Sequence, residues 1–135
     1  MAKALRENRY TDSGNGYYLL NQGNLLETKY VGNDCSAFIG ISMLGINHPS
    51  AFIRTRYLTT SSSYKTIQHS EMRPGDMMVL HNNHTVMFLY WVDTAHTKMM
   101  IIEQGGDGNT VICSIHDLSY YTSQGYIARR RADLN

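Results

Sequence analysis

The sequence predicts an α+β domain in which helices come first and an antiparallel sheet follows. Two observations support this fold class. A helix-like segment bounded by capping residues, Cys35 to Leu44, lies in the first half of the chain, and a series of short apolar runs separated by turn residues fills the second half. The length of 135 residues and the apolar content of 42% fit a single domain, 1–135, with one hydrophobic core.

The helix predicted over Cys35 to Leu44 has both a start and a stop. Asp34 is a favourable N-cap and Gly45 a favourable residue for ending a helix. Apolar residues lie nearly all round this segment, which predicts a buried helix. Other predicted elements of the first half are helical turns at 2–9, a helix at 51–57 that begins after Pro49, and a polar loop at 59–63.

Five strands are predicted in the second half, where β-branched and aromatic residues run between turn residues. Turn chemistry is strongest in the Gly-rich segment 105–109, and a shorter turn is predicted at 93–97. Consecutive short strands with tight turns pair antiparallel, so we expect an antiparallel sheet of about five strands. The strands are predicted at 77–80, 84–92, 98–103, 110–115 and 125–130.

Composition excludes several classes of protein. A net charge of +1 with 17% charged residues gives too weak a field for nucleic acid binding. The basic run 129–131 is interpreted as the solvated end of the last strand. No apolar stretch is long enough to span a membrane, and the first seven residues lack the apolar core of a signal peptide. The chain is therefore expected to be a mature domain or a piece of a longer exported protein.

The two cysteines have different sequence contexts. Cys113 lies in an apolar run and is predicted to be a small core residue, although a disulfide with Cys35 is the default alternative in an exported protein. Cys35 opens the predicted helix, where free backbone N–H groups and the helix dipole favour the thiolate. Those N–H groups are also suited to stabilise an oxyanion. Cys35 is therefore the candidate nucleophile.

A thiolate that cleaves an amide needs a proton donor, and His84 is the best candidate for that base. It begins a predicted strand, which places it at the rim of the sheet. Glu103 ends the next strand, 19 residues later (103 − 84), and an antiparallel hairpin brings these two positions together. Glu103 is predicted to orient the imidazole, with Gln104 as the second choice, while His81 is the rival base or a residue lining the groove.

Three motifs in this order carry a resemblance to a known family. The segment Asp34-Cys35-Ser36-Ala37-Phe38-Ile39 resembles the Asp-Cys-Ser-Gly-aromatic signature of NlpC-type cell-wall cysteine peptidases. Met72-Arg73-Pro74-Gly75-Asp76-Met77 is similar to their Leu-x-Pro-Gly-Asp-Leu element, and His84-Thr85-Val86-Met87-Phe88-Leu89 to their His-Val-Gly-Ile-Tyr strand. The resemblance covers about residues 30 to 131.

This resemblance implies a papain-like fold, in which the helix that carries Cys35 packs on the sheet. It implies hydrolysis of amide bonds in bacterial peptidoglycan stem peptides by Cys35 and His84, in the cell envelope or outside the cell, without a metal or other cofactor. The family commonly has histidine as its third residue, and Glu103 here is closer to the related CHAP amidases, which leaves peptidase and N-acetylmuramoyl-L-alanine amidase as alternatives. The substrate-binding positions it suggests are Tyr30, Asp34, Ser36, His81 and Gln104.

Other functions are weighed beside this one. Asp34 is interpreted as a helix cap rather than as a catalytic acid, and Asp76 as a turn residue after Pro74 and Gly75 rather than as a catalytic residue. A zinc site built from His81 and His84 with His96 or Cys113 would straddle strands and turns, and nothing in the spacing requires it. A module that binds wall peptides without cutting them would have a similar sequence. Flanking wall-binding domains or an inhibitor protein are expected partners.

Overall fold

The computed structural model describes residues 35–44, 54–105 and 111–134. By its internal contacts the chain divides into two compact units. One consists of residues 1–54 with 104–112, and the other of residues 55–103 with 113–135. The elements predicted at 2–9, residues 51–53 of the helix predicted at 51–57, and most of the Gly-rich turn lie outside the described residues.

In the first unit the described helix is α3, Cys35–Leu44, with the same bounds that the sequence predicts. The side chains of Ser36, Ala37 and Ile39 in its first half are buried, whereas Ser42 in its second half is exposed. Burial is therefore concentrated in the turn that follows Cys35. Within the described helix, neither the first nor the last turn carries a charged residue.

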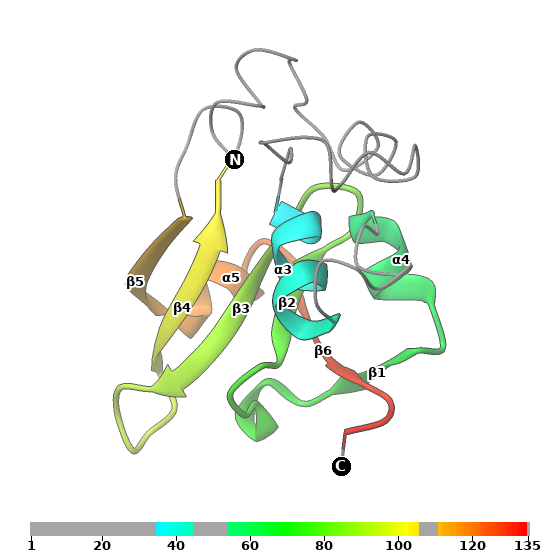
Figure 1. Ribbon diagram of the computed structural model, residues 1–135. Coiled ribbons are helices and arrows are strands. Elements are labelled where there is room, and N and C mark those ends of the chain that lie inside the picture. Colours follow the sequence, from blue (N-terminus) through cyan, green and yellow to red (C-terminus); the bar gives the residue numbers. More distant parts are fainter. Residues whose placement is uncertain (1–34, 45–53, 106–110, 135) are drawn as a thin grey trace. The chain divides into compact units, whose positions relative to one another are not determined.

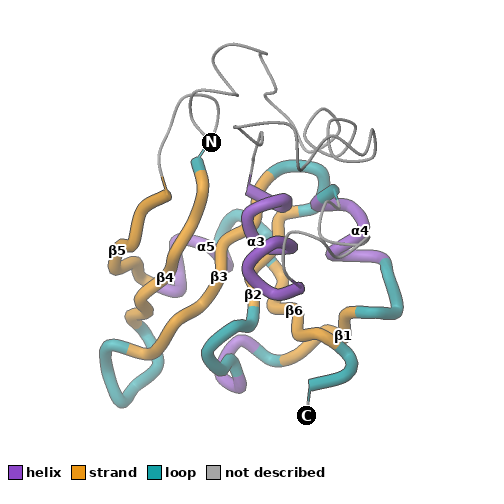
Figure 2. Tube along the Cα trace, viewed as in Figure 1, coloured by secondary structure: helices purple, strands orange, loops and turns teal. Residues whose placement is uncertain are grey.

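The sheet has six antiparallel strands in the order β1-β6-β2-β3-β4-β5, one strand more than predicted (Figures 1 and 2). The α+β class and the antiparallel pairing are confirmed, and the papain-like arrangement stays a prediction. The strands are β1 Tyr64–Ile67, β2 Met77–Leu80, β3 His84–Trp91, β4 Lys98–Gln104, β5 Val111–Asp117 and β6 Ile127–Arg131. The helical elements of this unit are α4 Thr55–Thr60, the short 3₁₀ turn η2 His69–Glu71 and α5 Leu118–Thr122.

Tight turns set the register of the central strands. Between β2 and β3, Asn82 adopts a left-handed backbone conformation with φ of 57°, and Asn83 N–H donates to the carbonyl of Leu80. Asparagine tolerates this conformation better than most residues. The turn leaves Leu80 paired with His84, so His84 is fixed as the first residue of β3.

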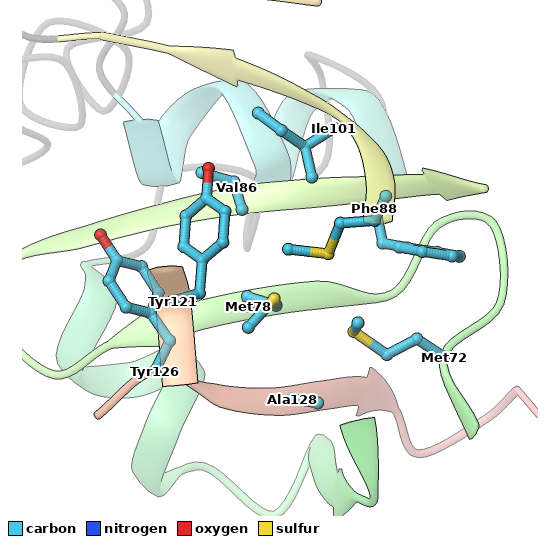
Figure 3. Packing of buried hydrophobic residues seen from close by; sticks show 9 residues of the cluster. Met72, Met78, Val86, Phe88, Ile101, Tyr121, Tyr126 and Ala128 are labelled. Carbon is cyan, nitrogen blue, oxygen red and sulfur yellow. The ribbon is translucent and has the colours of Figure 1, made fainter. Parts of the chain in front are cut away.

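One hydrophobic core cluster of the second unit lies on one face of the sheet. Met78 of β2 pairs with Val86 of β3 and with Ala128 of β6, so these three side chains project from the same face. Tyr121 of α5 and Tyr126 close over this face, and their rings meet nearly edge-on at 5.0 Å (Figure 3). The complete cluster consists of Met72, Met78, Val86, Phe88, Met99, Ile101, Tyr121, Tyr126 and Ala128.

The opposite face of the sheet carries a buried arginine. Arg129 of β6 donates hydrogen bonds to three backbone carbonyls, those of Leu58, Ser61 and Tyr64, and to the hydroxyl of Thr66. It therefore joins the end of α4 to β1. The interpretation of the basic run as a solvated strand end is wrong for Arg129 and Arg130, which are 6% and 8% exposed. The oxygen atoms that accept hydrogen bonds from Arg129 and Arg130 belong to segments that are distant in the sequence. The residues around 129–131 therefore give no local sign that these two arginines are buried.

The segment before β2 is organised by Asp76. Its carboxylate accepts a hydrogen bond from the backbone N–H of Arg73, and a bidentate pair of hydrogen bonds from the guanidinium of Arg130. Gly75 has a φ of 92°, a conformation that L-residues with a side chain rarely adopt. The Pro-Gly-Asp element is thus a turn, as predicted, and it also holds a buried ion pair.

Three elements differ from the sequence-based expectation. The polar run at 59–63 is expected to be a loop, yet α4 extends through Thr60, where Thr59 and Thr60 hydroxyls donate to the carbonyl of Arg56. Strand β1 is not predicted, because the four residues 64–67 lack a long apolar run. Helix α5 is not predicted either, since it is only five residues long.

Candidate active site

Cys35 is the first residue of α3 and is half-buried. The first backbone N–H groups of a helix have no acceptor within the helix itself, and Cys35 stands at that end of α3. The thiol is free. Ser36, predicted to bind substrate, follows it and is 1% exposed. Tyr30 and Asp34, the other predicted positions of this segment, lie outside the described residues.

His84 and Glu103 lie on adjacent strands and are hydrogen bonded. Glu103 Oε2 lies 2.5 Å from Nε2 of His84. Phe88 of β3 pairs with Ile101 of β4, and the alternation of side chains along each strand then places His84 and Glu103 on the same face as the core cluster. The predicted contact between these two side chains is confirmed, whereas their roles in catalysis stay a prediction.

The charge of the pair follows from its geometry. A carboxylate only accepts hydrogen bonds, so Nε2–H of His84 donates to Glu103. The hydrogen bond from His84 is the main cause that lowers the pKa of Glu103, and burial opposes it. The side chains of His84 and Glu103 are 22% and 16% exposed. Both side chains are therefore partly reachable from solvent and partly shielded from it.

His81 lies in the turn between β2 and β3 and is exposed. Its Nδ1 lies 2.5 Å from the hydroxyl oxygen of Thr59 in α4. Because the Thr59 hydroxyl donates its own hydrogen to the carbonyl of Arg56, the ring nitrogen of His81 must be the donor in this contact. In the neutral ring Nε2 of His81 is then the acceptor nitrogen, and the partner of the other nitrogen is a hydroxyl and not a carboxylate.

Gln104 follows Glu103 in β4 and is 3% exposed. Neighbouring residues of an extended strand project to opposite faces, so Gln104 points away from the side that carries Glu103. Its side-chain amide donates to the carbonyl of Gly105. The first choice of orienting residue, Glu103, is therefore the one that contacts His84.

The expectation that Cys113 is a core residue is wrong. Cys113 is exposed on β5, the edge strand of the sheet, and its thiol is free, which contradicts the disulfide alternative. An apolar run on an edge strand can have one face uncovered, and here Val111 and Ile115 are exposed as well. Within the described ranges, no three His, Cys, Asp or Glu side chains gather as metal ligands.

A cluster of aromatic rings around His116 is not predicted from the sequence. His116 of β5 lies among the tyrosines of α5, with ring centroids 5.6 Å from Tyr120 and 5.5 Å from Tyr121. Burial is the main cause that raises the pKa of Tyr121, and the charge of Glu103 is the second cause. In the sequence this cluster corresponds only to the run His-Asp-Leu-Ser-Tyr-Tyr at 116–121, and the spacing of residues in that run does not indicate a site.

Comparisons of the chain with protein-family models, curated proteins and solved structures gave no match. The resemblance to cell-wall peptidases therefore rests on the three motifs and their order. Among the helices that the structure describes, none has the length and apolar character needed to cross a membrane.

Proposed function

We propose that the chain is a cysteine hydrolase with Cys35 as nucleophile, His84 as general base and Glu103 as the residue that orients the imidazole. The observation that supports it most is the hydrogen bond of 2.5 Å between Nε2 of His84 and Glu103. A free, half-buried thiol at the start of a ten-residue helix supplies the second component. From the motif resemblance, we further propose that it is an endopeptidase acting on peptidoglycan stem peptides.

The pair of His84 and Glu103 determines which ring atom does the chemistry. Since Nε2 donates to the carboxylate, Nδ1 is the nitrogen that must accept the proton of the Cys35 thiol. The proposal therefore requires Sγ of Cys35 to meet Nδ1 of His84. Glu103 would hold the ring in this tautomer and stabilise the imidazolium that forms.

The proposed reaction has two stages. Sγ of Cys35 attacks the carbonyl carbon of the scissile amide, and the backbone N–H of Cys35 stabilises the oxyanion. The imidazolium of His84 then gives its proton to the leaving amine, and the C–N bond breaks to leave a thioester. Water, deprotonated by His84, attacks the thioester, releasing the carboxylic acid and restoring the thiol. The chemistry needs no metal or other cofactor.

The bond that is cut distinguishes two enzyme types. A glutamate as third residue is closer to the CHAP amidases, so N-acetylmuramoyl-L-alanine amidase activity is the alternative to endopeptidase activity. In either case His81, which is exposed, stays a proposed substrate contact together with Tyr30 and Asp34, whereas Ser36 and Gln104 are only 1% and 3% exposed and would act by supporting the site from behind. The setting proposed is the cell envelope or the exterior, with wall-binding domains or an inhibitor protein as partners.

Purified sacculi provide the direct test. Wild-type protein should release muropeptides whose masses identify the bond, and Cys35→Ala should release none. The matched control is Cys113→Ala, which removes the other free thiol from an exposed position on the edge strand and should retain wild-type activity. Equal release by wild type and Cys35→Ala would refute the mechanism. Binding of sacculi by wild type without any release would instead identify a non-catalytic wall-peptide module.

A further inference from the structure

The two edge strands of the sheet differ in how their free edges are protected. Strand β1, at one edge, has only the four residues Tyr64–Ile67 and carries Lys65. A short strand and a lysine both discourage pairing with another chain. Strand β5, at the other edge, has the seven residues Val111–Asp117, none of which is Lys, Arg, Pro or Gly. β5 therefore lacks the features that protect β1.

The hydrogen bonding of β5 to β4 determines which of its backbone groups face outward. Leu118 N–H, directly after β5, donates to the carbonyl of Thr97, so the even-numbered residues of β5 point their N–H and C=O groups at β4. The odd-numbered residues, which include Cys113 and Ile115, point these groups away from the sheet. Among the described strands, none lies beyond β5 to pair with them (Figures 1 and 2).

Apolar side chains reach this edge on one face of the sheet. The ring of His116 contacts Tyr121 of α5, so Ile115 projects from the opposite face. There Ile115 lies opposite Met100 of β4, which pairs with Tyr90 of β3. Ile115 and Tyr90 are 55% and 51% exposed. An exposed apolar row thus crosses three strands and ends at the free edge.

We propose that β5 is a self-association strand, which pairs antiparallel with β5 of a second copy of this chain. Pairing about a twofold axis at the central residue, Ser114, lets all seven residues overlap. Cys113 of each copy then lies opposite Ile115 of the other, so the outward backbone groups of the two strands exchange hydrogen bonds. The two six-stranded sheets join into one continuous sheet, with both apolar rows on the same face.

The charge pattern of β5 favours a second copy as the partner. Asp117, at one end of the strand, is its only Asp, Glu, Lys or Arg residue. In antiparallel self-pairing the two aspartates lie at opposite ends of the paired strands, each opposite Val111 of the other copy, so no like charges face each other. Because each β5 edge is then occupied and the remaining edge is the protected β1, the assembly closes as a dimer.

Substitutions at Ile115 separate association from folding. Its N–H points away from β4, so Ile115→Pro removes an outward donor without breaking a hydrogen bond between β4 and β5. Ile115→Lys places two like charges near the twofold axis and protects the edge as lysine does in β1. Either variant should raise the dissociation constant of the dimer by at least about tenfold, since each substitution acts twice in a twofold interface.

The matched control is Val92→Lys. It replaces another exposed apolar residue by lysine, just after β3 and away from the free edge of β5. This variant should change the dissociation constant by less than about twofold, as surface substitutions outside an interface usually do. The constant is measured on the full chain by sedimentation equilibrium over a wide range of concentrations. A reductant is present, so that Cys113 cannot link two copies covalently.

Amide hydrogen exchange of the wild-type chain, followed by nuclear magnetic resonance, gives a second measurement. Exchange at Cys113 and Ile115 should slow as the concentration rises and the dimer forms, whereas Ser114, whose N–H faces β4, should be protected at every concentration. Neither measurement uses activity, so the proposal stands or falls independently of the hydrolase function.

Three results would overturn the proposal. The first is a wild-type chain that sediments as a monomer at every concentration. The second is a dimer of unchanged strength in both Ile115 variants, which would assign the contact to another surface. The third is slow exchange at Cys113 and Ile115 that does not depend on concentration, which would show that another segment of the same chain covers β5.

Discussion

The substitution Glu103→Gln tests the central contact of the candidate site. Glutamine has nearly the same shape, and its amide oxygen can still accept from Nε2 of His84, but it carries no charge. The structure therefore predicts that the orientation of the ring survives while the stabilisation of the imidazolium is lost. The test is sensitive at this position because the side chains of Glu103 and His84 are only 16% and 22% exposed, so water screens their interaction poorly.

The magnitude follows from the kind of hydrogen bond. Hydrogen bonds to charged groups contribute about 1.5–3 kcal/mol, and each 1.36 kcal/mol corresponds to about tenfold in rate. If the bond acts on the transition state, Glu103→Gln should lower kcat/KM by between about tenfold and about 150-fold. Glu103→Ala should lower it further, since the ring then also loses its orienting partner.

The assay is the initial rate of muropeptide release from sacculi, measured by mass, at several substrate concentrations. The control is Asp117→Asn, which neutralises an exposed acid on β5 whose side chain makes no capping hydrogen bond to α5. This control should stay within about twofold of wild type, as surface substitutions usually do. If Glu103→Gln also stays within twofold, Glu103 does not orient the base and the proposed triad is wrong.

The remaining predictions concern the base, the buried arginine and acid stability. His84→Ala should lower turnover by about 10²–10⁴, whereas His81→Ala should raise KM with a much smaller change in kcat; the reverse result would exchange their roles. Arg129→Ala should lower the free energy of unfolding by about 2–4 kcal/mol in denaturant titrations, because three backbone carbonyls lose their hydrogen-bond donor. Arg131 is paired with the exposed Asp133, so Arg131→Ala should lower the free energy of unfolding by less than about 1 kcal/mol. The pKa of Glu103 is lowered in the folded state, so its contribution to stability is complete above its ordinary pKa of 4.5 and is lost as the pH falls further. Stability measured between pH 6 and pH 3 should therefore fall more steeply for wild type than for Glu103→Gln, and parallel curves would contradict this.

Local patterns are sufficient to predict the elements that frame the site. The helix over Cys35–Leu44 and the strand over Met77–Leu80 have the predicted bounds, because capping residues and turn residues mark their ends directly. The contact of His84 with Glu103 is also predictable. A hairpin with a short turn has only one register that keeps both apolar faces buried, and this register fixes which residues approach each other.

Interactions between residues distant in sequence are not predictable in the same way. The basic run at 129–131 is expected to be solvated, since nothing local indicates that Arg129 would meet carbonyls of residues 58, 61 and 64. Cys113 is expected in the core, because its apolar neighbours do not reveal that β5 is an edge strand. Both errors concern burial, which depends on the order of strands in the sheet.

The sequence by itself determined the candidate nucleophile, the candidate base and the acid that contacts it, since each stands at a helix or strand end marked by local chemistry. Only the tertiary structure decided what surrounds that acid. Tyr121 of α5 and Tyr126 close over the face that carries Glu103, because β5 pairs with β4 and the chain then folds back over that face. Pairing between strands brings together side chains from separate segments of the chain, and no local pattern in either segment records which partner it will meet.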